Sequence, residues 1–290
     1  MKRGKKKEQK NKVKKGFNFY LYYWAILALV VFFLINYFTQ NYTIEGLNLS
    51  LMISAVTFLF GFLVTISFSM LRSRAHQIGE CLAEETGTLV SLFLLSKHLG
   101  KKFHNRIKKR IDSYTIDTLT NLHEYEKGRD DLYGIYDDLN HIEVKSDKQS
   151  GMCESFCDTL SEFSNVREKI EFLTEKRLLK AVKIANYTLG IILIVLLFLN
   201  RGDTFTNSLF IVLSSVVVFI LLIIEDYDNL KIGEYNISTS NSEQIFDLIG
   251  HIRYYPEKVL KEVKLEKGKP YRIGFYNKRT KKWQVQETEI

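Results

Sequence analysis

An uncharged run of 21 residues holds the most informative pattern of this 290-residue chain: LMISAVTFLFGFLVTISFSML, residues 51–71. About 20 apolar residues are enough for a helix to cross a bilayer. With a helical period, one face of the run carries small or hydroxyl side chains, whereas the rest of its surface is bulky and apolar. The run therefore predicts a membrane-spanning helix with one weakly polar face. The residues on that face are Ser50, Ser54, Thr57, Gly61 and Thr65, followed by Phe68.

A stripe of small residues inside a span has two physical uses. It allows two helices to pack closely. Alternatively, it lines a water-filled path in which hydroxyls replace part of an ion's hydration shell and an apolar ring closes the path by dewetting. Arg72 would place positive charge at the mouth of such a path. Close packing stays open as the alternative. The candidate pore-lining residues are Ser54, Thr57, Gly61, Thr65 and Phe68, with Arg72 and His76 at the cytoplasmic mouth.

Three more segments have the length and composition of spans. Residues 17–38 and 204–224 carry no charge, and residues 178–199 are apolar except for Lys180 and Lys183 near their start. Long basic side chains at such positions reach back to the interface. We therefore expect an all-α membrane protein with four transmembrane helices in two pairs.

The rest of the chain divides around these pairs. We expect a basic arm at 1–16, spans at 17–71, a helical region at 72–177, spans at 178–224 and a C-terminal region at 225–290. The second and third spans run without a breaker into the helical region, so we expect continuous helices there. The C-terminal region alternates polar and apolar residues at 271–276 and 282–286, which predicts a small β-hairpin after a helix.

The placement of Lys and Arg predicts the orientation. The net charge is +8, and nine basic residues beside one Glu give the arm 1–16 that whole excess. The only basic residue in the links 39–50 and 200–203 is Arg201. By contrast, residues 72–183 hold 19 basic residues and residues 225–290 hold twelve. Because basic residues remain on the cytoplasmic side, we expect a multi-pass protein in the lipid bilayer of the plasma membrane, with both termini in the cytoplasm.

The chain carries no catalytic motif. It has no Gly-rich phosphate loop, nucleophile elbow or zinc-protease helix, so we expect neither an enzyme nor a cofactor. The cores of the spans hold no Asp, Glu, Arg or His. Proton-coupled transporters and voltage sensors need such groups, which leaves a passive channel or a non-conducting protein.

Three clusters of polar residues have ordinary alternatives. Cys153 and Cys157 lie one helical turn apart; a metal site would need two more ligands and no His is nearby in sequence, so the alternative is that they are small residues of a helical bundle. The run 101–110 holds six basic residues; it forms a solvated face or contacts anionic lipid, and it lacks the aromatic platform of a nucleic-acid site. The weak candidates for a divalent cation are Glu225, Asp226 and Asp228; the alternative is that these carboxylates pair with Lys and Arg.

The topology resembles that of the bestrophins. The short segments in which the sequence itself resembles that family are AEETGTLVSLFLL (83–95), IDSY (111–114), LLKAVK (178–183) and EDYDN (225–229). Over about residues 20–250 the chain is similar to the bacterial bestrophin-like family of four-span membrane proteins. This resemblance implies a homo-oligomeric anion channel, a pentamer in bestrophins, with small anions as the permeating species and the second helix lining the pore. The acidic segment is shorter than the bestrophin calcium clasp and lacks its Pro-Phe-Gly lead-in.

Two functions follow as hypotheses. The first is a passive, anion-preferring channel that assembles as a homo-oligomer around the second span. The second is a non-conducting membrane scaffold or sensor that acts through its cytoplasmic helical region.

Overall fold

The computed structural model describes residues 19–39, 49–120, 129–144, 146–230, 234–260, 263, 265–277 and 282–289. The predicted basic arm at 1–16 lies outside these residues. The helices are α1 Phe19–Phe38, α2 Ser50–Ser96, η1 Lys97–Leu99, α3 Lys101–Thr120, α4 Arg129–Leu139, α5 Asp147–Glu175, α6 Lys180–Leu199, α7 Thr204–Asp228, α8 Glu234–Ile249 and η3 Glu257–Val259. The strands are β1 Tyr254–Pro256, β2 Pro270–Asn277 and β3 Lys282–Glu289.

Four of these helices are long and apolar enough to cross a membrane, which confirms the predicted spans. The first half of α2 lies with α1, α6 and α7 in one bundle, the membrane bundle. Gly190 lets α6 approach α7 closely, since a Cβ at that position would lie 3.1 Å from a methyl group of Leu221.

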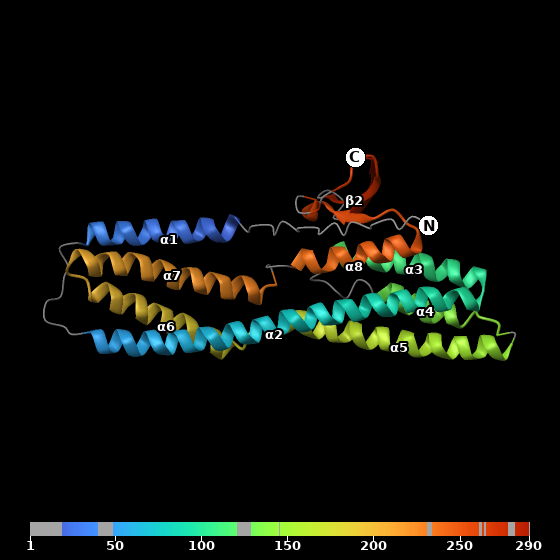
Figure 1. The fold of residues 1–290 in the computed structure, drawn as a ribbon, viewed down its shortest axis with the longest axis horizontal. Helices are drawn as coiled ribbons and strands as arrows, with labels where there is room; N and C mark the ends of the chain where they lie inside the picture. The colour runs from blue at the N-terminus through green and yellow to red at the C-terminus, as the bar shows by residue number, and fades with distance from the viewer. Residues whose placement is uncertain are drawn as a thin grey trace, which may run out of the picture.

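The second half of α2 leaves the membrane bundle and packs along α5 (Figure 1). There it forms the extramembrane body together with α3, α4, α8 and the strands. Side chains such as Phe156, Leu160, Phe163 and Ile107 are fully buried in the core of this body. The predicted continuity of the second span is confirmed, because α2 runs for 47 residues and gives way to η1 just before Gly100.

The C-terminal region forms a small sheet on α3 and α8. The predicted hairpin is β2 and β3, which pair antiparallel with Tyr271 opposite Thr288. A third strand, β1, pairs parallel to β2 with Tyr254 opposite Arg272. The all-α membrane fold with a small β element is therefore as predicted, with one more strand than the alternating pattern indicated.

The expectation of one continuous helix into the third span is wrong. α5 ends at Glu175, and the extended residues 176–179, here called the elbow, separate it from α6. Two tertiary interactions satisfy the backbone groups that the break exposes. The guanidinium of Arg74 donates to the carbonyls at the end of α5, and the carboxylate of Asp228 accepts the N–H of Leu178. Both partners are distant in sequence, so the local periodicity carries no sign of the break.

Candidate functional site

The weakly polar face of α2 is open in the single chain. Ser54, Thr57, Gly61 and Thr65 are all exposed. No atom lies within 4 Å of the position that a Cβ would take at Gly61. The hydroxyls of Ser54 and Thr65 each donate to a carbonyl four residues earlier, at 2.8 Å. Their protons are thereby used within the helix, and the face presents oxygen lone pairs to its surroundings.

Phe68 lies apart from that open face. Its ring is half-buried and stands edge-on to the ring of Tyr227 at 6.3 Å between centroids. It packs against the cluster of Leu71, Leu178 and Ile224, where α2, α6 and α7 meet. Phe68 therefore connects α2 to the neighbouring helices of its own chain.

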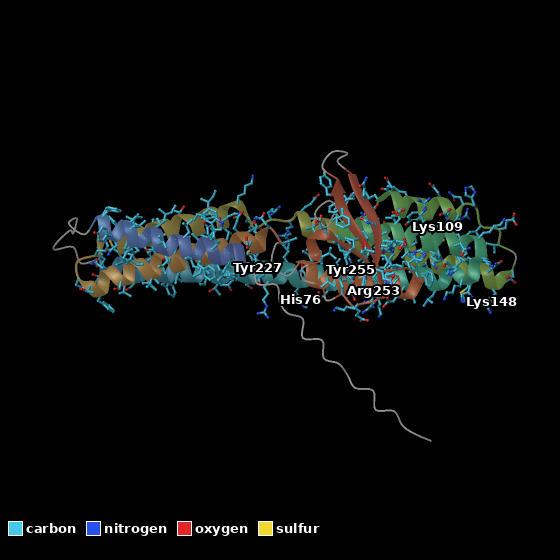
Figure 2. The ribbon with its side chains drawn as sticks, turned by 90° about the horizontal axis from the view of Figure 1, so that it is seen from above. His76, Lys109, Lys148, Tyr227, Arg253 and Tyr255 are labelled. Carbon is cyan, nitrogen blue, oxygen red and sulfur yellow. The ribbon has the colours of Figure 1, made fainter. Side chains whose placement is uncertain are left out.

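Arg72 and His76 follow the open face past the span. Both side chains are exposed, and the imidazole of His76 lies 3.2 Å from the carboxylate of Glu80 on the next turn. Figure 2 shows His76 and Tyr227 at a similar position along the long axis of the molecule, near the level at which the membrane bundle gives way to the extramembrane body.

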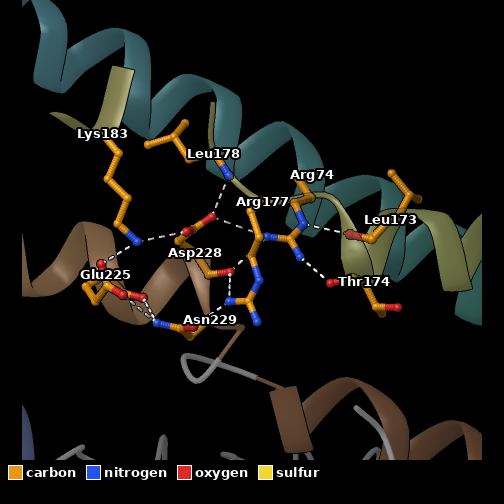
Figure 3. Close-up of polar contacts among 9 residues, drawn as sticks. All are labelled: Arg74, Leu173, Thr174, Arg177, Leu178, Lys183, Glu225, Asp228 and Asn229. Carbon is orange, nitrogen blue, oxygen red and sulfur yellow. Dashed lines mark hydrogen bonds and ion pairs between the residues drawn. The ribbon is translucent and has the colours of Figure 1, made fainter. Parts of the chain in front are cut away.

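A polar cluster at that level, built around the buried side chains of Arg74 and Asp228, connects four segments (Figure 3). We call it the junction; its residues are Arg74, Arg177, Lys183, Glu225, Asp228 and Asn229. Arg74 of α2 is only 7% exposed. Its guanidinium donates to the carbonyls of Leu173 and Thr174 at 2.7 Å each, and to the carbonyl of Asp228 at 3.0 Å. One side chain of α2 thereby holds the end of α5 and the end of α7.

Asp228 is the most connected residue of the junction. Its carboxylate accepts the N–H of Leu178 at 2.7 Å and lies 3.2 Å from the ammonium of Lys183. The same ammonium lies 2.6 Å from the carboxylate of Glu225. Arg177 donates to the carbonyl of Asp228 at 3.1 Å. Lys183 thus sits between two carboxylates at the end of α7, as Figure 3 shows.

This arrangement bears on the weak candidates for a cation site. Glu225 and Asp228 pair with basic side chains, which is the ordinary alternative named above. The charge that a divalent cation would supply between them is already supplied by Lys183, so the residues as arranged do not fit such an ion. Asp226 is buried on the same turn. Among the described residues there is no group of three or more His, Cys, Asp or Glu side chains placed to hold a metal.

Sequence reasoning missed Arg74. The signal was present, because Arg74 falls on the same helical face as Leu71, Ile78 and Leu82, which is the buried face of α2. An arginine within an apolar stripe indicates a buried guanidinium with distant partners. Nothing in the local sequence identifies those partners, since two of them are backbone carbonyls of α5.

The opposite end of the membrane bundle holds a second buried arginine. Arg201, in the link between α6 and α7, donates to the side chain of Thr39 at 2.7 Å and to the carbonyl of Phe198 at 2.9 Å. Its guanidinium lies 3.8 Å from the centre of the Phe198 ring. It thus fastens the end of α1 to the link between α6 and α7.

The basic run at 101–110 begins α3 at the end of the body far from the membrane bundle; Lys109 marks it in Figure 2. Two of its arginines face α4, where Arg106 lies 3.2 Å and Arg110 lies 3.5 Å from the carboxylate of Asp138. The apolar residues Phe103 and Ile107 of the run are buried, and its basic side chains lie on the other side of α3, two of them paired with α4, away from the membrane bundle.

Four apolar helices joined through a buried junction to a helical body define a polytopic α-helical membrane protein. The model of the bestrophin-like domain matches residues 22–242, and the chain belongs to the bestrophin-like family. At the level of the family, this membership supports a membrane channel that works as an oligomer, and the family is not one of enzymes.

Solved structures agree on the fold. Two variants of a bacterial bestrophin homolog from Klebsiella pneumoniae superpose on the chain with TM-scores of 0.54 and 0.57. They are 15% and 14% identical to it and cover 80% of this chain and 98% and 99% of their own. A comparison with curated protein sequences gave no match.

Proposed function

We propose that the protein is a passive, anion-preferring channel in the plasma membrane, with both termini in the cytoplasm, and that copies of the chain assemble so that α2 lines the pore. The observation that carries this proposal is the open face of α2. Ser54, Thr57, Gly61 and Thr65 are exposed although they lie in a span whose other side packs against α6 and α7. The hydroxyl oxygens can accept hydrogen bonds from water, and with the open space above a glycine they suit a narrow aqueous path better than they suit lipid; they do not themselves select anions, so the anion preference rests on Arg72.

Charge supports the preference for anions. Arg72 is exposed at the end of the open face, one turn beyond Phe68. In an assembly around α2, each copy would add one such guanidinium at the mouth. A ring of Arg or Lys raises the local concentration of anions.

Cysteine modification in liposomes tests this proposal. A background with Cys81, Cys153 and Cys157 replaced by serine receives either Thr65→Cys or Ser208→Cys. Both hydroxyls are exposed and donate to their own helix at 2.8 Å, but Ser208 lies on α7. A charged thiol reagent should reduce chloride flux strongly in Thr65→Cys and leave Ser208→Cys unchanged. Absence of any ion flux from intact oligomers would overturn the proposal.

The scaffold hypothesis makes a different prediction for the same face. If the stripe only packs against a neighbouring copy, Gly61→Leu should prevent assembly while Thr57→Val is harmless. A Cβ at Gly61 would meet no atom of another helix of its own chain within 4 Å, so a loss of assembly would report on a neighbour and not on misfolding. A channel instead requires oligomers of Gly61→Leu to form and to conduct less.

A further inference from the structure

The outer side of the elbow presents apolar and basic side chains together. Phe172, just before the elbow, and Leu179 within it are each 63% exposed. The ammonium of Lys176 lies 5.6 Å from the centre of the Phe172 ring. Lys180, on the first turn of α6, is exposed as well. Large apolar groups beside flexible cations are typical of residues at a membrane interface.

The inner side of the elbow fixes this outward presentation. Leu178 is buried, and its N–H donates to the carboxylate of Asp228 at 2.7 Å. The guanidinium of Arg177 turns inward to the carbonyl of Asp228 and the side chain of Asn229. The side chains of Lys176 and Leu179 are both exposed.

The elbow continues into an exposed stripe of α6. At 1.5 Å per residue the 20 residues of α6 are about 30 Å long, which equals the thickness of a hydrocarbon core. The first turn of α6 therefore lies at one edge of that core, and the elbow lies among the headgroups. The exposed stripe consists of Lys180, Ile184, Tyr187, Ile191 and Val195.

We propose that the elbow binds an anionic phospholipid, with its phosphate between Lys176 and Lys180 and an acyl chain along the apolar stripe of α6. Charge favours this occupant, since residues 175–180 hold three basic side chains against the single carboxylate of Glu175. Because Arg177 donates to the carbonyl of Asp228 in the junction, the two lysines are the basic side chains that contact the lipid. Bound lipid would stabilise the outer side of the elbow, whose inner side is held by the junction.

Lipid binding by the purified full-length protein tests the proposal. Native mass spectrometry would compare the retention of phosphatidylglycerol and phosphatidylcholine by the wild type and by the double variant Lys176→Gln/Lys180→Gln. The matched control is Lys109→Gln/Lys148→Gln, two exposed lysines far from the membrane bundle (Figure 2). Because each basic side chain near an anionic surface is worth about 1 kcal/mol, the elbow variant, which lacks two, should bind phosphatidylglycerol on the order of 30-fold more weakly. The control should bind like the wild type, and phosphatidylcholine should be retained equally by all three.

Two further measurements distinguish a bound lipid from free phosphate or a second protein chain at the elbow. Glycerol 1-phosphate carries the headgroup charge without acyl chains and should not compete with the lipid, and Leu179→Ser should weaken lipid binding while the fold is kept. Effective competition by glycerol 1-phosphate would instead indicate a site for free phosphate. Disulfide cross-linking of Leu179→Cys between copies in membranes would show that a second chain covers the elbow. Either result, or undiminished phosphatidylglycerol binding by the elbow variant, overturns the proposal. None of these measurements depends on ion conduction.

Discussion

Asp228 shows how much a single side chain contributes to the connection between the two halves of the molecule. It accepts a backbone N–H of the elbow and faces the cations of Arg74 and Lys183. Its side chain is 3% exposed, so water cannot replace those partners. A carboxylate in this position holds one end of α7 against the break between α5 and α6.

We predict that Asp228→Asn destabilises the protein by about 3 kcal/mol, because an isosteric neutral group leaves the buried guanidinium of Arg74 without its counter-charge. Glu225→Gln is the matched control. It removes the other carboxylate beside Lys183, but its side chain is 39% exposed and water screens the loss. The free energy of unfolding in detergent, measured for both variants, checks this ranking; equal losses would contradict it.

Among the individual elements, the spans were predictable and the elbow was not. Length and apolar composition are local properties of the sequence, so α1, α2, α6 and α7 follow from them directly. The break at 176–179 depends on Arg74 and Asp228, which lie about 100 residues before and 50 residues after it. A pattern read within one segment does not include such partners.

The candidate site divides in the same way. Helical periodicity correctly placed Ser54, Thr57, Gly61 and Thr65 on one face, because their common orientation follows from helix geometry alone. It also put Phe68 on that face, but the ring turns toward Tyr227 of α7. The neighbouring helix decides the direction of a long side chain that lies at the edge of a face. The periodicity of α2 does not specify that neighbour.

The sheet is held on α3 by a polar contact that responds to pH. Arg272 of β2 donates twice to the carboxylate of Asp112, at 2.7 Å each, and His251 lies 3.0 Å from it. Burial alone would raise the pKa of Asp112, but the hydrogen bonds and charges of Arg272 and His251 outweigh it and lower the pKa below the ordinary value of 3.8. The stabilising effect of the ionised carboxylate is therefore complete above about pH 4 and is lost as the pH falls through the lowered pKa.

We predict that acidification from pH 6 to pH 3 loosens β1 and β2 before it affects α5. Hydrogen exchange of the corresponding peptides, corrected for the intrinsic rate at each pH, measures this. In Asp112→Asn the strands should already exchange faster at pH 7 and should change little with pH. A pH dependence of the strands that is the same in the variant and the wild type would show that another group controls it.

For the whole molecule, the distribution of charge makes a prediction about topology. The extramembrane body should face the cytoplasm, because the region 72–183 is rich in Lys and Arg and the links 39–50 and 200–203 are not. With Cys81 and Cys153 replaced by serine, a membrane-impermeant thiol reagent should label the exposed Cys157 in inside-out vesicles and not in intact cells.

Gly202→Cys in a cysteine-free background is the matched control for that experiment. Gly202 lies in the link between α6 and α7, and a Cβ there meets no atom within 4 Å. It should be labelled in intact cells. Labelling of Cys157 from outside the cell would reverse the proposed orientation.

The unbroken length of α2 has a mechanical consequence. At 1.5 Å per residue its 47 residues extend about 70 Å. Arg74, where the junction grips it, lies 24 residues after Ser50 and 22 residues before Ser96. The junction therefore holds α2 near its middle, with segments of nearly equal length on its two sides, one in the membrane bundle and one in the extramembrane body. If α2 moves as a stiff rod about this point, a sideways displacement of its half in the body would move its half in the membrane in the opposite direction by a similar amount.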